Sequence, residues 1–149
     1  MKTSRRPFIL AYGLCVGLTL SAFAGNDHAH KATPGGGRLL EKTEPLAEFV
    51  VEKDRSITIN FYNAEMKPVA ATTQTVTLIV SAKDKTTIEF EKKGAALVSK
   101  TKLPEGEGYN LVVQFKQTAD AKPQNFRFKL DLHICGECKR AEYACTCGH

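Results

Sequence analysis

Alternation of apolar and polar residues over short segments is the feature that most constrains the fold. Ile57, Ile59 and Phe61 alternate with polar neighbours, and the same two-residue period recurs at residues 76–80 and 111–115. Successive side chains of a β-strand point to opposite faces, so this period is typical of strands with one buried face. The chain from residue 38 to residue 132 therefore predicts β-structure, with no convincing helical period.

Short β-segments of this kind are separated by turns rich in glycine, proline, asparagine and aspartate. There are about seven of them, at residues 46–51, 57–61, 76–80, 88–90, 96–99, 111–115 and 126–132. Such a series predicts an all-β fold, an immunoglobulin-like antiparallel β-sandwich of about seven strands over residues 38–132. The chain has no tryptophan and lacks the Cys…Trp…Cys signature of antibody domains, so only the architecture is implied.

The first 24 residues have the pattern of a signal peptide. Three basic residues precede an apolar run over residues 8–20, and residues 22–24 form an Ala-x-Ala cleavage site. The apolar run is short for a membrane span, and no later segment approaches its length. We therefore expect a soluble exported protein, periplasmic or secreted, with no membrane span after signal cleavage.

Residues 4–9, Ser-Arg-Arg-Pro-Phe-Ile, also resemble a twin-arginine export signal. An ordinary secretory signal with two adjacent arginines is the alternative, and the sequence leaves both open. The twin-arginine route moves folded protein, so it would allow a metal to be loaded in the reducing cytoplasm.

Charge and motifs exclude several functions. Cleavage removes three basic residues and no acidic ones, so the formal net charge falls from +5 to +2. No basic run interleaved with aromatic residues remains, and we expect no nucleic-acid partner. We find no Gly-rich phosphate loop, no G-x-S-x-G motif and no carboxylate pair in a recognisable catalytic setting, so we do not expect an enzyme.

Residues 25–37 read as a flexible leader ahead of the β-domain. This leader carries the pair His28 and His30 beside Asp27. A His-x-His pair can add weak metal affinity, although in a linker it is more often only solvated.

The four cysteines outside the signal peptide all lie in the tail, residues 133–149. They are Cys135, Cys138, Cys145 and Cys147, in a C-x2-C-x6-C-x-C pattern. A C-x2-C pair can form a tight turn that points both sulfurs at one centre, and Gly136 eases the backbone into it. In an extended C-x-C pair both side chains project to the same side. The tail therefore predicts a site for one thiophilic ion, Zn²⁺ or Cu(I).

The predicted ligands are the four thiolates, or three thiolates with His149 or His133 replacing the fourth. Two other readings remain open: disulfides, which exported proteins form readily, and a C-x-x-C redox pair. A disulfide gains most by closing a long loop, whereas every bridge here would join residues at most twelve apart. The redox pair lacks the βαβ context that such motifs need. We therefore favour the metal site.

Three stretches carry a family resemblance. Residues 34–40 read Pro-Gly-Gly-Gly-Arg-Leu-Leu, residues 47–51 read Ala-Glu-Phe-Val-Val, and residues 67–69 read Lys-Pro-Val. Together they resemble the N-terminal β-rich domain of periplasmic adaptor subunits of heavy-metal efflux pumps and related free-standing exported proteins. That family often has histidine or asparagine where this chain has Gly35, so a metal contact from that position is lost. The resemblance covers roughly residues 34–132 and implies an exported β-sandwich linked to metal handling.

These observations predict an exported metal-binding protein for sequestration, delivery or sensing, with a metal ion and an envelope metal-efflux or delivery protein as expected partners. The alternative is an envelope interaction module with a disulfide-bonded tail and no metal role. A mature chain of 125 residues should reach the usual stability of about 5–15 kcal/mol from its own core, so we expect the β-domain to fold without the tail.

Overall fold

A computed structural model describes residues 31–147 of the chain. The predicted signal peptide, the histidine pair of the leader and His149 lie outside the described residues.

The described residues form nine β-strands and one short 3₁₀ helix, η1. The strands are β1 (Arg38–Leu40), β2 (Leu46–Val51), β3 (Ile57–Tyr62), β4 (Pro68–Val69), β5 (Thr75–Ser81), β6 (Lys85–Lys93), β7 (Ala96–Ser99), β8 (Asn110–Lys116) and β9 (Gln124–Lys129), and η1 is Glu142–Ala144. The all-β fold is confirmed, and each of the seven predicted segments corresponds to a strand. The two further strands, β1 and β4, have only three and two residues, too few to show a period.

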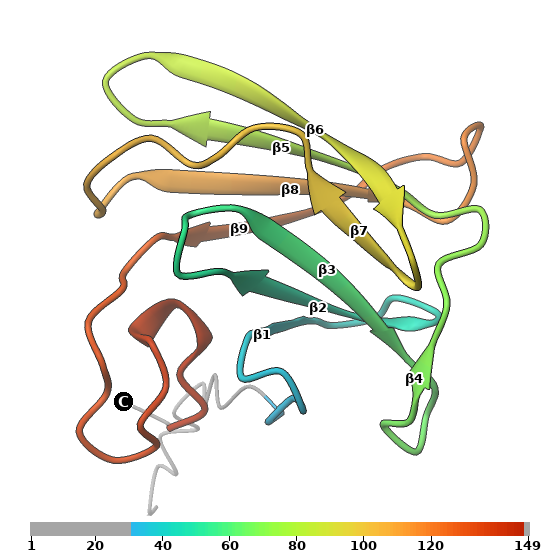
Figure 1. Cartoon of the computed structure of the whole chain (residues 1–149), viewed down its shortest axis with the longest axis horizontal. Helices are drawn as coiled ribbons and strands as arrows, with labels where there is room; N and C mark the ends of the chain where they lie inside the picture. Colours follow the sequence, from blue (N-terminus) through green and yellow to red (C-terminus); the bar gives the residue numbers. More distant parts are fainter. Residues whose placement is uncertain (1–30, 148–149) are drawn as a thin grey trace, which may run out of the picture.

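The strands form one continuous antiparallel sheet that is nearly closed into a barrel (Figure 1). Its order is β1-β2-β3-β7-β6-β5-β8-β9, and β4 pairs with β3. Strand β6 pairs with β5 through Lys85–Glu89 and with β7 through Phe90–Lys93. Because β6 carries the hydrogen bonding from one half to the other, the seven-stranded sandwich of two separate sheets is not confirmed.

The core fills the space inside the curved sheet. Its largest fully buried side chains include Phe49, Phe61 and Phe115 together with isoleucine and leucine side chains of β3, β5 and β8. Apart from Phe49, these are the apolar members of the alternating segments, as their period requires. The rings of Phe61 and Phe115 lie 6.4 Å apart and join β3 to β8 across the core.

Strands β1 and β9 stand at the two ends of the sheet order and are not paired with each other. We call the line between these two strands the seam, and side chains bridge it. The guanidinium of Arg38 lies 4.8 Å from the ring centre of Phe128, and the edge of Phe128 meets Phe49 at 5.3 Å between ring centres. A hollow lined by residues of both strands marks the line where the barrel stays open.

The tail packs against the barrel beside this seam (Figure 1). Tyr143 and Ala144 of η1 are buried and belong to the same core as the strands. The Tyr143 ring stacks on Phe128 with centres 6.3 Å apart and meets Phe49 edge-on at 6.1 Å. Residues of the tail are therefore part of the domain core, and folding of the β-domain without the tail stays a prediction.

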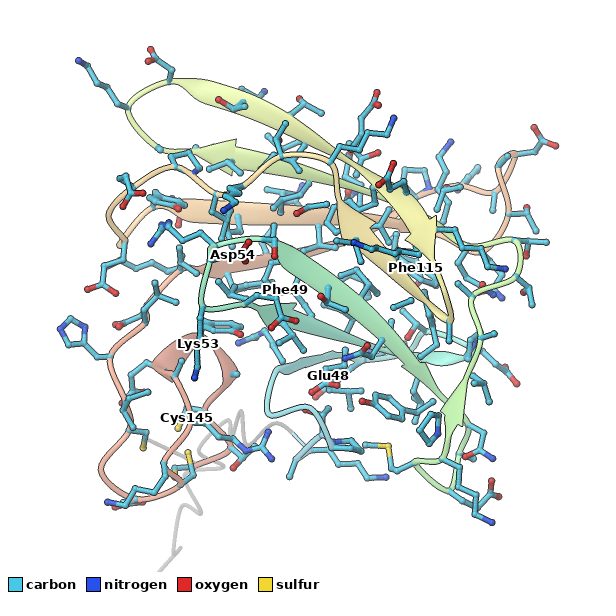
Figure 2. The ribbon with its side chains drawn as sticks, viewed as in Figure 1. Glu48, Phe49, Lys53, Asp54, Phe115 and Cys145 are labelled. Carbon is cyan, nitrogen blue, oxygen red and sulfur yellow. The ribbon has the colours of Figure 1, made fainter. Side chains whose placement is uncertain are left out.

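A buried carboxylate organises the first turn, residues 34–37. Glu48 and Phe49 lie next to each other on β2 and point to opposite faces: Phe49 enters the core and Glu48 faces the turn (Figure 2). The Glu48 side chain has no exposed surface and accepts hydrogen bonds from the Gly37 amide (2.8 Å), the Gly35 amide (3.2 Å) and the Tyr62 hydroxyl (2.6 Å). A β-carbon at Gly35 would lie 2.5 Å from the Glu48 carboxylate, so the glycine is needed for space.

No helix within residues 31–147 is long and apolar enough to cross a membrane.

Candidate metal centre

The four tail cysteines converge on one point. We call Cys135, Cys138, Cys145 and Cys147 the four-cysteine centre; their sulfur atoms all lie within 4.8 Å of one another. The Cys135 and Cys147 sulfurs are 3.9 Å apart, and the Cys138 and Cys145 sulfurs are 3.7 Å apart. Thiolates bound to one tetrahedral zinc at about 2.3 Å would have sulfurs about 3.8 Å apart. The spacing of the four sulfurs therefore fits a single tetrahedral ion.

A tight turn forms the first half of the centre. The Cys135 amide donates to the Arg140 carbonyl (2.8 Å), and the Lys139 amide donates back to the Cys135 carbonyl (3.1 Å). Lys139 has a positive φ of 59°, so this residue and not Gly136 takes the left-handed conformation. A β-carbon at Gly136 would meet no atom within 4 Å, so the turn does not require glycine at the position expected to ease it.

The second half of the centre follows η1. A bridge between Ile134 and Ala141 turns the chain back, and η1 then delivers Cys145 to the Cys135–Cys138 turn. The Cys147 amide donates to the Cys145 sulfur at 3.4 Å. Cys135 and Cys145 are buried, whereas Cys138 and Cys147 are partly exposed. An ion held here would be enclosed on the barrel side and open to solvent at two sulfurs.

Electrostatics favour one thiolate among the four sulfurs. Hydrogen bonds from the Thr146 and Arg140 backbone amides, with support from neighbouring thiols, lower the pKa of Cys138 to about 6. Burial, a hydrogen bond with Glu137 and the other thiols raise the pKa of Cys147. The first deprotonated sulfur thus opposes deprotonation of its neighbours. A bound cation removes this conflict, because thiolates are the form that metals bind.

Hydrogen bonds donated by three residues anchor the centre to the barrel. Arg140 donates to the carbonyl of Thr33 (3.0 Å), and Arg38 donates to the carbonyl of Tyr143 (3.0 Å). The Val51 amide at the end of β2 donates to the Tyr143 hydroxyl (2.9 Å). Arg140 precedes η1 and Tyr143 lies within it, so the geometry of the four-cysteine centre depends on the barrel as well as on the tail.

The prediction that the four cysteines lie together is confirmed. The two histidines that were considered as alternative ligands differ in their outcome. His133 lies with Asp131 and Glu107 instead of with the sulfurs, so it does not replace a thiolate. Its predicted alternative role at the four-cysteine centre was wrong, because β9 ends at Lys129 and the chain bends before the cysteines. His149 lies outside the described residues and stays a prediction.

Sequence reasoning missed two groups. One is Glu48, a single charged residue inside an apolar strand, which is a readable sign of a buried and paired carboxylate. The other is the group formed by Glu107, Asp131 and His133. Glu107 and Asp131 flank the β8–β9 hairpin, whose antiparallel pairing brings Asn110 opposite Lys129. Recognising the hairpin would have placed both carboxylates at the same end of the sheet.

Comparison of the chain with protein-family models, with curated proteins and with solved structures gives no match.

Proposed function

We propose that this protein binds one Zn²⁺ ion through the thiolates of the four-cysteine centre and handles that metal outside the cytoplasm. The observation that carries the proposal is that the four cysteine sulfurs all lie within 4.8 Å of one another, with two of the pairs 3.7 and 3.9 Å apart. Four sulfur ligands around one point favour zinc, whose protein sites are almost always tetrahedral. Cu(I) also accepts thiolates and is the alternative ion.

Exposure of two sulfurs supports a role in sequestration or delivery. Cys138 and Cys147 are partly exposed, so a competing thiol could reach the ion without unfolding the domain. The fold nevertheless fixes the two buried cysteines: Cys145 directly follows core residues of η1, and the Cys135 amide is bonded to the Arg140 carbonyl. Export rests on the signal-like first 24 residues, and an envelope metal-efflux or delivery protein is the partner that the family resemblance supports.

Metal analysis of the full chain, purified from its native compartment, tests the proposal. We expect about one zinc per protein and four thiols that react only after a chelator removes the metal. Serine in place of any one of the four cysteines should greatly lower zinc retention. His149→Gln is the matched control: unchanged retention means that four thiolates suffice, and a loss means that His149 contributes.

One observation favours a second candidate, the envelope interaction module with a disulfide-bonded tail. Two sulfur pairs lie close together, Cys135 with Cys147 at 3.9 Å and Cys138 with Cys145 at 3.7 Å, so oxidation could join the thiols in pairs. Native protein with no transition metal, whose thiols react only after a reductant is added, would establish this candidate and end the zinc proposal. If the native protein instead carried stoichiometric copper, the four-cysteine centre would be supported and Cu(I) would replace Zn²⁺ as its ion.

A further inference from the structure

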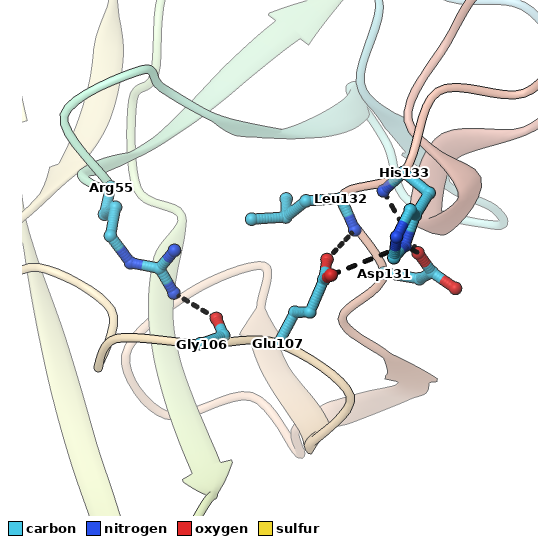
Figure 3. Close-up of polar contacts among 6 residues, drawn as sticks. All are labelled: Arg55, Gly106, Glu107, Asp131, Leu132 and His133. Carbon is cyan, nitrogen blue, oxygen red and sulfur yellow. Dashed lines mark hydrogen bonds and ion pairs between the residues drawn. The ribbon is translucent and has the colours of Figure 1, made fainter.

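A second group of metal-ligating side chains lies where the barrel leads into the tail. It consists of Glu107, Asp131 and His133, whose ligand atoms all lie within 4.8 Å of one another (Figure 3). The His133 Nδ1 atom is 3.0 Å from the nearer Asp131 oxygen and 3.4 Å from the nearer Glu107 oxygen. One ring nitrogen thus faces two carboxylates from separate parts of the chain.

These separations suit a shared ion. Two ligand atoms bound at about 2.1 Å lie about 3.0 Å apart at a right angle and about 3.4 Å apart at the tetrahedral angle. Without an ion, Nδ1 carries at most one proton to share between two carboxylates, whose charges repel each other. A divalent cation in place of that proton would neutralise both carboxylates.

Backbone contacts hold the three side chains in place. The Leu132 amide donates to the far oxygen of Glu107 (2.7 Å), which turns the near oxygen toward His133 (Figure 3). The loop that carries Glu107 is fixed in turn by Arg55, whose guanidinium donates to the carbonyls of Pro104 and Gly106. Arg55 therefore positions this loop.

The segment that carries the other two ligands is also fixed. The Tyr143 amide donates to the Asp131 carbonyl (3.0 Å), and the Glu142 amide donates to the His133 carbonyl (2.8 Å). Both donors belong to η1, so the same helix that leads into Cys145 holds Asp131 and His133. Metal-ligand geometry here is supported by elements that the core anchors.

We propose that Glu107, Asp131 and His133 form a second metal site, which takes one borderline divalent transition ion such as Zn²⁺. Imidazole with carboxylates suits zinc, nickel or copper better than calcium or magnesium. Water completes the coordination, because the site opens into a hollow of about 320 Å³ lined partly by Glu107 and His133. Three protein ligands leave a coordination position for water, as in zinc sites that are not purely structural.

This second site is weaker than the four-cysteine centre and shares no ligand with it. The His133 side chain is 78% exposed, and those of Glu107 and Asp131 are 36% and 40% exposed, so solvent screens their charges. The positive charge of Arg55 lines the same hollow and lowers affinity for a cation. An ion here would exchange more easily than one held by four thiolates.

Zinc titration of the full chain tests the second site. The background carries His28→Gln, His30→Gln and His149→Gln, so that His133 is the sole histidine of the four in the sequence. Reduced protein is first loaded with one equivalent of Zn²⁺ and then titrated calorimetrically with more. We expect a second, weaker equivalent, and at the same stoichiometry a shift of the His133 ring signals in NMR spectra.

Substitutions then distinguish direct coordination of the ion from nonspecific attraction of the ion by negative charge. His133→Gln should abolish the second equivalent and leave the first, and Glu107→Gln should weaken the second about tenfold or more. Glu105→Gln removes the same charge from the same loop at a residue outside the group, and should leave the second equivalent unchanged.

Three results would overturn the second site: no second equivalent, a second equivalent that survives His133→Gln, or equal weakening by Glu105→Gln and Glu107→Gln. These results do not touch the first equivalent, which depends on the cysteines. Conversely, protein whose single equivalent is lost with His133→Gln and kept with Cys138→Ser would establish this site and reject the four-cysteine centre.

Discussion

The guanidinium of Arg140 donates a hydrogen bond of 3.0 Å to the backbone carbonyl of Thr33, a residue 107 positions earlier in the chain. It also reaches the Thr33 hydroxyl at 3.4 Å. Arg140 follows the first cysteine pair, and its own carbonyl accepts the Cys135 amide. The turn that presents two sulfurs is therefore joined directly to the first turn of the barrel.

Arg140→Gln should lower both the stability of the domain and its zinc retention. A hydrogen bond from a charged group contributes about 1.5–3 kcal/mol, and its loss here also frees the Cys135–Cys138 turn. Urea unfolding with and without bound zinc measures the effect. Arg127→Gln, at an exposed position on β9, is the control and should change stability by less than about 0.5 kcal/mol. Equal effects of the two substitutions would contradict the role of Arg140.

Tyr143→Ala should destabilise the whole domain, because this tail residue packs on Phe49 and Phe128 of the barrel. Replacing a large buried ring with alanine costs about 3–5 kcal/mol. Tyr143→Phe keeps the ring and removes only the acceptor of the Val51 amide, so we expect a smaller loss of about 1–3 kcal/mol. Thermal unfolding compares the two variants. A wild-type melting temperature for Tyr143→Ala would show that the tail is a separate appendage.

Gly35→Ala should be destabilising by about 1–3 kcal/mol, the usual cost of overpacking. The added methyl would meet the Glu48 carboxylate, which cannot swing away without losing its buried hydrogen bonds. Gly136→Ala is the matched control, because a methyl there meets no atom within 4 Å. Chemical unfolding of both variants gives the comparison, and the prediction fails if Gly35→Ala is as stable as Gly136→Ala.

The stabilising contribution of Glu48 should be lost in acid. Burial raises its pKa, but hydrogen bonds from Thr33, Tyr62, Gly37 and Asn60 outweigh burial and hold the pKa below the ordinary value. A lowered pKa in the folded state contributes stability above the ordinary value of 4.5, and this contribution is lost as the pH falls through the lowered pKa. The stability gap between wild type and Glu48→Gln should therefore be largest near neutral pH and shrink below pH 4.5.

Urea unfolding at several pH values between 7 and 3 tests this effect. Glu65→Gln, at an exposed turn position, serves as the control and should run parallel to wild type over the whole range. A gap between wild type and Glu48→Gln that stays constant with pH would mean that the carboxylate charge is not what stabilises the first turn.

The strands were predictable from sequence because alternation is a local signal, and β3, β5 and β8 show it over six or seven residues. Sheet closure was not predictable in the same way. It depends on β6 changing partners at Phe90, and no local pattern reports which strand pairs with which.

The same distinction between local and long-range signals applies to the candidate site. The four cysteines are close in sequence, so their spacing alone indicated a common centre. Tyr143 and Arg140 contact residues about a hundred positions away, and their short-range pattern gives no hint of those partners. The thiol cluster of the tail was therefore predicted correctly, whereas the contacts of the tail with the core were not predicted.

The pairing of β6 with both halves of the sheet affects how the domain unfolds. The nine residues of β6 supply hydrogen bonds to both halves, so neither half can melt without leaving the other with a bare edge. Since η1 belongs to the same core, unfolding of the barrel would also disrupt the arrangement of the four cysteine sulfurs. Melting of the sheet and release of the ion should therefore occur in one cooperative transition.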